Sequence, residues 1–529
     1  MERSILHICL PSWILAVLTG LLYPLCFPSF ELGWLAWLCL IPLHAAIHTR
    51  SVRSSFWLGW LAGFVAFTGS MYWVVIAMHL YGQIPVAVSL LIMCVLTSYL
   101  GLYFACYACG VSWINHKAPR WLWVAAPSLW VTLEFLRTYL LTGLPWVLLG
   151  YSQYRWLTVI QIADLTGVYG ISFLIVLVNS VLVSLLEWSR RSRKGLSASS
   201  LWSHFPWQAV GLVSLVLIGV MVYGRQQLTN ESSLKTTAPT LRIGVVQANI
   251  DQARKWDRAY REETIRRYAN LSHRLGNIVD LLIWPEAATP FLFEREPDYQ
   301  RSIFQIVRQV NAPLVFGSPA LRFAEDGKPY LLNSAFLVTP GGEIAGRYDK
   351  RHLVPFGEYI PLRSLLFFLE KLVVGIGDFA PGTGPMTLPL PATDDHPDVR
   401  LGIAICYEVI FPDLVRRMAD EGANLLLTIT NDAWFGRSVA PYQHFGMVVL
   451  RAVENRLAVA RAANTGISGF IAPSGEILAA TPIFTEQVIR GQLPLRTSST
   501  FYSRYGDVFS WSCVIMAALS LGIAWRRRQ

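Results

Sequence analysis

Cys406 is the residue of this sequence whose type and surroundings most directly suggest chemistry. It ends an apolar, strand-forming run at 401–406, and Tyr407 and Glu408 follow it at once. The other seven of the eight cysteines lie in strongly apolar segments. A buried free cysteine often serves only as a small hydrophobic side chain. A nucleophilic role for Cys406 requires a base and a group that stabilises an oxyanion elsewhere in the chain.

Two further reactive side chains also follow strand-like runs. Glu286 lies in WPEAATP, and Lys350 ends GRYDK. Residues after the strands of a layered sheet commonly face a cleft, although a single such Glu or Lys is usually a solvated loop residue. Because a thiol is mostly protonated at neutral pH, Glu286 would take the proton of Cys406. Lys350 and the backbone N–H of Tyr407 would then stabilise an oxyanion on a carbonyl substrate.

Other catalytic and binding patterns are weaker in this sequence. No Gly-x-Ser-x-Gly elbow occurs, and neither His352 nor His444 has an evident serine partner. The cysteines are scattered along apolar segments, which argues against a disulfide scaffold and a zinc site. We therefore expect no metal and no cofactor.

The composition is that of a membrane protein. Of the 529 residues, 53% are hydrophobic and only 15% are charged, a higher apolar and a lower charged share than in soluble domains. The net charge of +10 would suit a nucleic-acid partner, but the Lys and Arg residues form short clusters beside apolar runs. Membrane topology explains these clusters better, so we expect no nucleic acid.

Eight apolar runs are long enough to cross a bilayer. They lie at about 8–27, 32–48, 55–79, 84–113, 121–141, 157–187, 207–224 and 508–525.

The loops between these runs predict the orientation. Loops rich in Lys and Arg alternate with loops nearly free of them, and positive loops are retained on the cytoplasmic side. We therefore expect a seven-helix transmembrane domain at 1–225 and an extracytoplasmic domain at 226–507. A C-terminal transmembrane helix with a basic cytoplasmic tail follows at 508–529.

Three charged residues fall within or beside the predicted spans. Glu134 and Arg137 lie three positions apart in one run, and Asp164 lies near the start of another. Charge inside a membrane is costly, so each is a functional candidate. A mutually satisfied pair, or a position near the headgroups, is the structural alternative.

The polar region has the pattern of a layered α/β domain. A polar linker is expected at 226–239, and short apolar strands then alternate with polar helices. The expected strands include 241–249, 280–288 and 312–320, and a Gly-Gly turn joins two strands within 334–350. Such alternation predicts an α+β or α/β domain of stacked layers.

Several short motifs give this region a family resemblance. WPEAATP, YDK, PFGEYIP, CYE and NDAWFG occur in the order that is typical of the nitrilase (carbon–nitrogen hydrolase) superfamily. Set between seven N-terminal spans and one C-terminal span, the region resembles the apolipoprotein N-acyltransferase family of the bacterial inner membrane. LTGLPWVLLGYSQ at 141–153 and QIADLTGVYGISFL at 161–174 extend the resemblance into the membrane part.

The resemblance implies an αββα sandwich that faces the periplasm. Glu286 would be the base, Lys350 the oxyanion partner and Cys406 the nucleophile. Further residues expected at or around the site are Trp256, Glu358, Tyr407 and Glu408. Alternatively, Trp256 is a surface aromatic residue, and the two glutamates only orient the lysine.

The resemblance also implies a reaction, the last step of lipoprotein maturation. Cys406 would take an acyl chain from a phospholipid, with phosphatidylethanolamine as the expected donor, and form a thioester. The free α-amino group of a diacylglyceryl-cysteine at a lipoprotein N-terminus would then accept the chain. The competing interpretations are a membrane-anchored amidase and a lipid-binding or transport protein without catalysis.

The segment at 361–380 is the remaining candidate for a functional element. It is strongly apolar but interrupted by Arg363, Glu370 and Lys371, and Gly375 and Gly377 follow. This pattern favours an interfacial arm over a ninth span. The hypothesis is a lid that dips into the outer leaflet, and the alternative is an ordinary buried helix.

Overall fold

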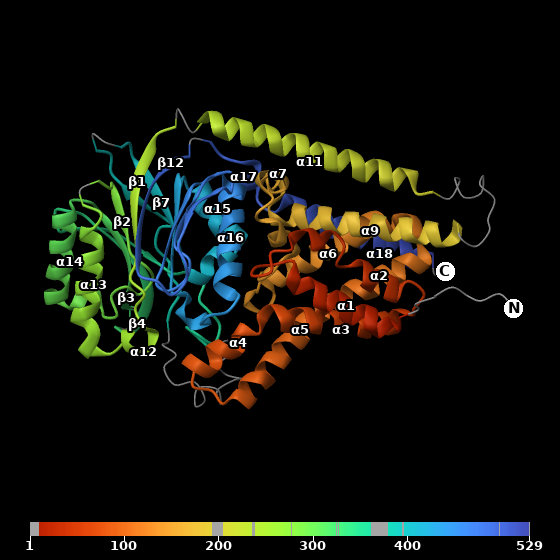
Figure 1. Ribbon diagram of the computed structural model, residues 1–529, viewed down its shortest axis with the longest axis horizontal. Helices are drawn as coiled ribbons and strands as arrows, with labels where there is room; N and C mark the ends of the chain where they lie inside the picture. The colour runs from red at the N-terminus through yellow and green to blue at the C-terminus, as the bar shows by residue number, and fades with distance from the viewer. Residues whose placement is uncertain are drawn as a thin grey trace.

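The computed structural model describes residues 10–192, 205–234, 238–276, 278–323, 325, 327–360, 379–393, 396–496 and 498–527. These residues form a helical part and a two-sheet α/β part, which lie side by side along the longest axis of the molecule (Figure 1). The predicted arm at 361–380 lies outside the described residues except for its last two positions.

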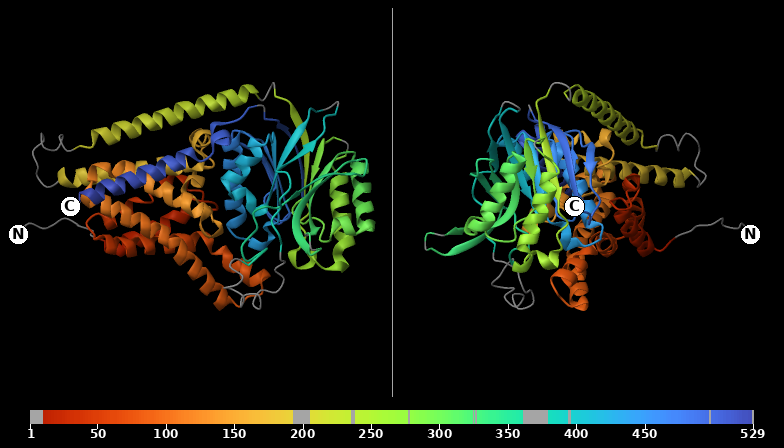
Figure 2. Two further views of the ribbon diagram at one scale, coloured as in Figure 1. Left: turned by 180° about the vertical axis from the view of Figure 1, so that it is seen from behind. Right: turned by 60° about the vertical axis from the view of Figure 1, so that its left-hand side comes forward.

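The helical part joins the N-terminal half of the chain to its last helix, which runs beside the others (Figure 2). Its elements are α1 (Ser12–Leu25), η1 (Gly33–Trp37), α2 (Ile41–Ile47), α3 (Val52–Met71), α4 (Trp73–Ile76), η2 (Ala77–Tyr81), α5 (Val86–Lys117), η3 (Pro119–Trp121), α6 (Leu122–Tyr139), η4 (Leu140–Thr142), η5 (Leu149–Gln153), α7 (Leu157–Ile160), α8 (Ala163–Thr166), α9 (Val168–Ser192), α11 (Trp207–Leu234) and α18 (Val508–Arg526).

Four of the described helices, α5, α9, α11 and α18, are long and apolar enough to cross a membrane. The pair formed by α3 and the segment Trp73–Tyr81 would make a fifth span, although it bends by 49°. Shorter apolar helices occupy Ser12–Leu25, Gly33–Ile47 and Leu157–Thr166. The helices fit a membrane domain, and the full number of eight spans remains a prediction.

Two predicted boundaries in this part are wrong. The run at 157–187 is not one helix, because the chain breaks at Gly167, where φ is 63°. The backbone N–H of Val168 then donates to Glu454 of the α/β part at 2.9 Å, which satisfies one free donor at the start of α9. The expected linker at 226–239 is helical in its first part, since α11 continues into it as far as Leu234.

The charged residues of the predicted spans have separate partners. Glu134 accepts a hydrogen bond from the backbone N–H of Leu149 at 2.7 Å. Arg137 is buried, yet among the described contacts it forms no ion pair with Glu134. Asp164 lies 2.6 Å from Arg456 of the α/β part. Asp164 therefore links the helical part to the α/β part.

The α/β part contains two six-stranded sheets, with the strand orders β12-β1-β2-β3-β4-β5 and β11-β10-β9-β8-β7-β6. Its elements are β1 (Thr240–Gln247), α12 (Gln252–Lys255), η6 (Arg258–Tyr260), α13 (Arg261–His273), β2 (Leu281–Ile283), η7 (Phe293–Arg295), α14 (Pro297–Val310), β3 (Leu314–Phe323), β4 (Pro329–Val338), β5 (Ile344–Asp349), β6 (Thr387–Leu390), β7 (Val399–Ile405), η9 (Cys406–Ile410), α15 (Pro412–Asp420), β8 (Leu425–Thr430), η10 (Asp432–Phe435), α16 (Ala440–Asn455), β9 (Val459–Ala463), β10 (Gly469–Ile471), β11 (Ile477–Ala480), β12 (Gln487–Pro494) and α17 (Phe501–Tyr505).

Alternation of side chains along the strands explains the layers. Leu241, Ile243 and Val245 of β1 point into the core between the sheets, which also contains Ile403 of β7. Val246 points to the opposite face and packs in the core that includes α13 and α14. Helices α15 and α16 cover the outer face of the second sheet (Figure 1). The predicted sandwich of two sheets between helical layers is confirmed.

The layer formed by α15 and α16 rests on the helical part (Figure 1). Trp146 of the helical part donates its indole N–H to Gln443 of α16 at 2.7 Å. Arg451 of the same helix donates to the hydroxyl of Tyr151 at 3.2 Å. Because α16 lies between the second sheet and the bundle, nearly all of its side chains are buried. The edge of the sheet where β7 and β8 end is thereby fixed relative to the helices.

Candidate active site

Glu286 follows β2 in a tight turn that the next strand closely approaches. A Cβ atom at Gly317 of β3 would lie 2.5 Å from the backbone nitrogen of Ala287, so a glycine is needed there. The carboxylate of Glu286 accepts hydrogen bonds from the side-chain amide of Asn333 at 2.8 Å and from the backbone N–H of Asn431 at 2.9 Å. Glu286 is therefore buried but held by two donors.

Lys350 follows β5 and is 1% exposed. Its ammonium group lies 2.9 Å from Glu358 Oε1 and 3.6 Å from Glu286 Oε1. The other oxygen of Glu358 accepts from the backbone N–H of Val354 at 2.8 Å. Burial disfavours the charge on Lys350, but the two carboxylates outweigh that effect and raise the pKa of Lys350. The group therefore stays a cation at neutral pH.

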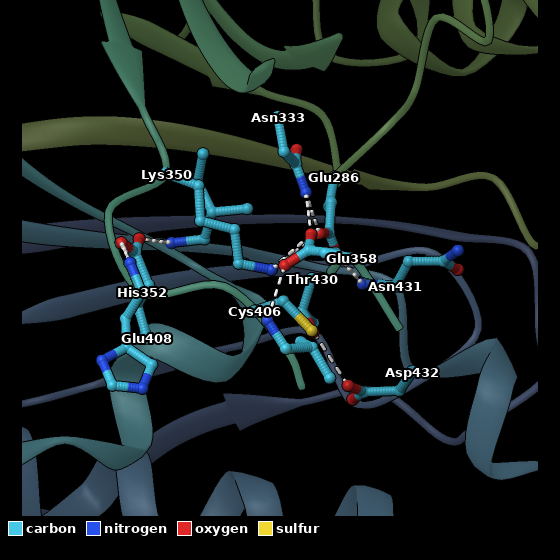
Figure 3. A network of polar contacts seen from close by, with 12 residues as sticks. Glu286, Asn333, Lys350, His352, Glu358, Cys406, Glu408, Thr430, Asn431 and Asp432 are labelled. Carbon is cyan, nitrogen blue, oxygen red and sulfur yellow. Dashed lines mark hydrogen bonds and ion pairs between the residues drawn. The ribbon is translucent and has the colours of Figure 1, made fainter. Parts of the chain in front are cut away.

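Cys406 follows β7 as the first residue of the short helix η9. Its φ of 53° is a left-handed backbone conformation that is uncommon for a residue with a Cβ atom. The thiol lies near the point where the side chains of Glu286, Lys350 and Glu358 converge (Figure 3). Burial and the nearby carboxylate of Glu286 raise the pKa of Cys406, and Lys350 opposes them only in part. The free site therefore holds a protonated thiol.

Glu408 fixes the turn that carries Cys406. Its carboxylate accepts hydrogen bonds from the backbone N–H groups of Ile405 at 2.8 Å and Arg351 at 2.7 Å. It also accepts from the hydroxyl of Tyr348 at 2.9 Å. Burial raises the pKa of Glu408 to about 7, although these donors favour the carboxylate. Glu408 thus joins the end of β7 to the segment after Lys350.

Tyr407 connects this site to the helical part. Its hydroxyl donates to the backbone carbonyl of Gly143 at 3.1 Å, and its ring packs on Phe411 with centroids 5.2 Å apart. The segment that ends at Gly143 is unusual, because Leu141 and Thr142 also have positive φ values of 51° and 75°. A strained loop of the bundle therefore borders the residue after Cys406.

Trp256 is not part of this cluster. Its side chain is 48% exposed, whereas the neighbouring Lys255 is 1% exposed. The ammonium of Lys255 donates to the backbone carbonyl of Glu286 at 3.1 Å. Burial lowers the pKa of Lys255 to about 8, with Glu286 and Cys406 acting in the opposite direction. The structure thus brings together six of the seven predicted site residues and leaves Trp256 at the surface.

Three residues of the cluster were missed by the sequence analysis. Asn333 donates to both Glu286 and Glu358, at 2.8 Å in each case, and lies in the middle of β4 without any local signal. Asn431 follows β8 within NDAWFG. Its place directly after a strand is the same signal that indicated Glu286 and Cys406. Lys255 stands next to Trp256 in RKWD and could have been found there.

The arrangement places a carboxylate, a cation and a thiol around one point. Such a group can move the thiol proton to the carboxylate as sulfur attacks a carbonyl carbon, while the cation stabilises the developing oxyanion. Among the described residues, no three His, Cys, Asp or Glu side chains lie close enough to hold a metal ion.

Comparison with known proteins covers nearly the whole chain. A family model described as the apolipoprotein N-acyltransferase N-terminal domain matches residues 19–181, and the carbon–nitrogen hydrolase model matches residues 242–501. The apolipoprotein N-acyltransferase of Geobacter metallireducens is 44% identical over 98% of this chain and 96% of its own length. The chain belongs to the apolipoprotein N-acyltransferase family.

A second apolipoprotein N-acyltransferase, that of Pseudomonas aeruginosa, is 32% identical over 94% of this chain and 92% of its own length. Among solved structures, Nit3 of Saccharomyces cerevisiae, a member of the nitrilase superfamily, matches 48% of this chain and 90% of its own. It is 18% identical, with a TM-score of 0.36.

Proposed function

We propose that this chain transfers an acyl chain from a phospholipid to the N-terminal cysteine of lipoproteins, with Cys406 as the nucleophile. Membership of the apolipoprotein N-acyltransferase family supports the reaction class. The observation that carries the residue assignment is the convergence of Glu286, Lys350 and Cys406, which come from three separate strand ends. Phosphatidylethanolamine is the proposed donor.

In the first step the Cys406 sulfur attacks the ester carbonyl of the donor while Glu286 accepts the thiol proton. Lys350 and the backbone N–H of Tyr407 stabilise the oxyanion. The carbon–oxygen bond of the ester then breaks, and Glu286 returns the proton to the departing glycerol oxygen. The products are a lysophospholipid and a thioester on Cys406.

In the second step the α-amino group of a diacylglyceryl-cysteine attacks the thioester. Glu286 accepts a proton from the attacking nitrogen, and the carbon–sulfur bond breaks. The proton then returns to the sulfur of Cys406, which leaves an amide on the lipoprotein and regenerates the enzyme. Glu358 and Asn333 keep Lys350 and Glu286 in place during both steps, as their hydrogen bonds support.

The proposed location follows from the substrates, which both reside in a bilayer. We place the helical part in the bacterial inner membrane and the α/β part in the periplasm. The hydrogen bond between Tyr407 and the loop at Gly143 supports a site that lies next to the helices.

Mass spectrometry of Cys406 tests this function. The purified full chain is incubated with phosphatidylethanolamine, analysed for an acyl group on Cys406, and then given a diacylated lipopeptide. We expect a hydroxylamine-sensitive adduct that disappears as the lipopeptide gains an amide-linked chain. Cys406→Ser is the negative control.

Two results would reject the proposal. If no acyl adduct forms on Cys406 of the wild-type protein, the thioester mechanism is rejected. An adduct that discharges to water at the same rate with and without lipopeptide identifies a hydrolase of the amidase class.

A further inference from the structure

The peptide bond between Cys406 and Tyr407 carries two groups that point in opposite directions. In a trans peptide the C=O and N–H bonds are antiparallel within one plane. The N–H of Tyr407 is the proposed oxyanion donor, and it lies in the first turn of η9, where helical N–H groups lack intrahelical acceptors. Whatever holds the carbonyl of Cys406 therefore also sets the direction of that N–H.

His444 of α16 holds this carbonyl. Its Nε2 lies 3.2 Å from the carbonyl oxygen of Cys406, and its side chain is 1% exposed. A carbonyl oxygen can only accept, so Nε2 must carry the hydrogen for this bond to form. The ring of Trp146, from the helical part, covers the imidazole with centroids 5.6 Å apart.

A buried ion pair behind His444 is compatible with a hydrogen on Nε2, which the contact with the Cys406 carbonyl requires. Nδ1 of His444 lies 3.0 Å from Asp432 Oδ1 and 3.0 Å from Arg461 Nη2. A neutral imidazole with Nε2–H accepts from Arg461 at Nδ1, and an imidazolium donates to Asp432 from Nδ1. Both of these states have a partner at Nδ1 and keep Nε2–H, whereas the other neutral tautomer would set a bare Nε2 against the carbonyl oxygen of Cys406.

The ion pair is itself fixed on the second sheet. Arg461 of β9 lies 2.9 Å from Asp432 Oδ2 and donates to the hydroxyl of Thr428 at 3.2 Å and to the carbonyl of Ile467 at 3.1 Å. Asp432 Oδ1 also accepts from the hydroxyl of Thr430 at 2.8 Å. The charged pair is fully buried, so its orientation is tightly restricted.

We propose that His444 is a positioning residue of the oxyanion site. By donating to the carbonyl of Cys406, it holds the strained peptide so that the N–H of Tyr407 points at the oxyanion. Hydrogen bonding at the carbonyl also polarises the peptide and strengthens its N–H as a donor. The inference deepens the proposed function and rests on it for the identity of the acyl donor.

The test compares two reactions of the Cys406 thiol in the full chain. Acylation by the p-nitrophenyl ester of a fatty acid passes through an oxyanion, whereas alkylation by iodoacetamide does not. In His444→Phe, we expect the rate constant of acylation at saturating ester to fall at least about tenfold, because losing one oxyanion donor costs roughly 10²–10³. KM and the alkylation rate should change less than about twofold.

Two further substitutions separate the contacts of His444. His444→Gln carries an amide N–H near the position of Nε2, and it should restore most of the acylation rate. His444→Asn reaches only the Nδ1 side and should remain slow. His44→Phe is the matched control, because it removes another buried histidine whose Nε2 lies 2.8 Å from Tyr107 in the helical part.

The outcomes distinguish the inference from the proposed function. If the aryl ester acylates the wild-type protein but phospholipid does not, the proposed phospholipid transferase activity is rejected. The comparison of wild type with His444→Phe on the aryl ester then still tests the role of His444. Equal acylation rates in wild type and His444→Phe overturn the inference. Parallel loss of acylation and alkylation, without rescue by His444→Gln, also overturns it, because His444 would then only maintain the fold. Apparent Tm values are measured for each variant.

Discussion

The thiol of Cys406 is surrounded by groups that keep it protonated until a substrate arrives. Its pKa is raised by burial and by the carboxylate of Glu286, and Lys350 is already engaged by two carboxylates. A resting thiol instead of a thiolate protects the residue from oxidation, since the thiolate is the reactive form. In the proposed mechanism, reactivity then depends on proton transfer to Glu286 at the moment of attack.

Glu286 has two proposed effects on Cys406: its charge raises the pKa of the thiol, and its carboxylate accepts the thiol proton. The substitution Glu286→Gln separates them. The substitution removes a negative charge, so the pKa of Cys406 falls and its thiolate fraction at pH 8 rises. We expect faster alkylation of Cys406 by iodoacetamide at pH 8, measured by mass spectrometry of its peptide. Acyl transfer should fall by about 10²–10⁴, because the general base is lost.

The wild-type alkylation rate should keep rising with pH above 9, since the raised pKa leaves the thiol incompletely ionised there. Glu263→Gln on the exposed face of α13 is the control and should change neither reaction. Slower alkylation in Glu286→Gln would contradict the proposed electrostatic effect.

Helix α16 is a second element, besides the segment of Tyr407, that joins the site to the bundle. It carries Gln443 and His444 at one end and Arg451 and Glu454 towards the other, so one helix contacts both the Cys406 peptide and the helical part. The ion pair between Arg451 and Glu454 is completely buried at 2.8 Å. Val168 at the start of α9 donates to the same carboxylate.

Removing one partner of this pair should be costly. Arg451→Met leaves the buried Glu454 without its cation, and the expected loss of unfolding free energy is on the order of 3–5 kcal/mol. Burial raises the pKa of Glu454 to about 7 while Arg451 opposes this shift, so the substitution raises the pKa further. The pKa of a glutamate in the unfolded chain is about 4.3. Stability is therefore lost as the pH rises from this value to the pKa of Glu454 in the folded protein.

We therefore expect the apparent Tm of Arg451→Met to go on falling from about pH 7 to about pH 9, where the fall of the wild-type Tm levels off. Adding Glu454→Gln removes the unpaired charge and keeps an acceptor for the N–H of Val168. The double variant should recover much of the stability and lose the extra pH dependence. A double variant as unstable as Arg451→Met would contradict this explanation.

The whole molecule joins an α/β sandwich to a helical bundle through a broad polar and aromatic interface. Asp164 and Arg456, Trp146 and Gln443, and the loop at Gly143 all contribute contacts across it. Since the outer layer of the second sheet is buried against the helices, the sandwich is not an independent unit on a flexible tether. This arrangement suits two substrates that stay in the membrane.

The proposed orientation predicts which residues a membrane-impermeant maleimide reaches in cells with a permeabilised outer membrane. Arg301→Cys on α14, whose side chain is 75% exposed, should be labelled, whereas Lys117→Cys at the exposed end of α5 should not. Lysis should make both accessible. Labelling of Lys117→Cys alone in intact cells would place the α/β part in the cytoplasm. The chain without added cysteines gives the background.

The site residues that could be predicted from the sequence are those whose signal is local. Glu286, Lys350 and Cys406 each follow a strand-like run, and the structure brings all three together. The two-sheet architecture followed from alternating strands and helices and from the family motifs. Trp256 was expected near the site because of its motif, but Lys255, the last residue of α12, is buried there, and Trp256 directly after it is exposed.

The sequence by itself determined which chemistry the chain carries and that a long apolar part accompanies it, because both depend on residue types and on nearby spacing. The tertiary structure decided which groups complete the site. The backbone of Asn431 meets Glu286 across 145 residues, and His444 meets the Cys406 carbonyl across 38. Such contacts arise only when separate sheets and helices pack against one another. The left-handed backbone conformation of Cys406 also depends on this packing, because the surrounding hydrogen bonds maintain it.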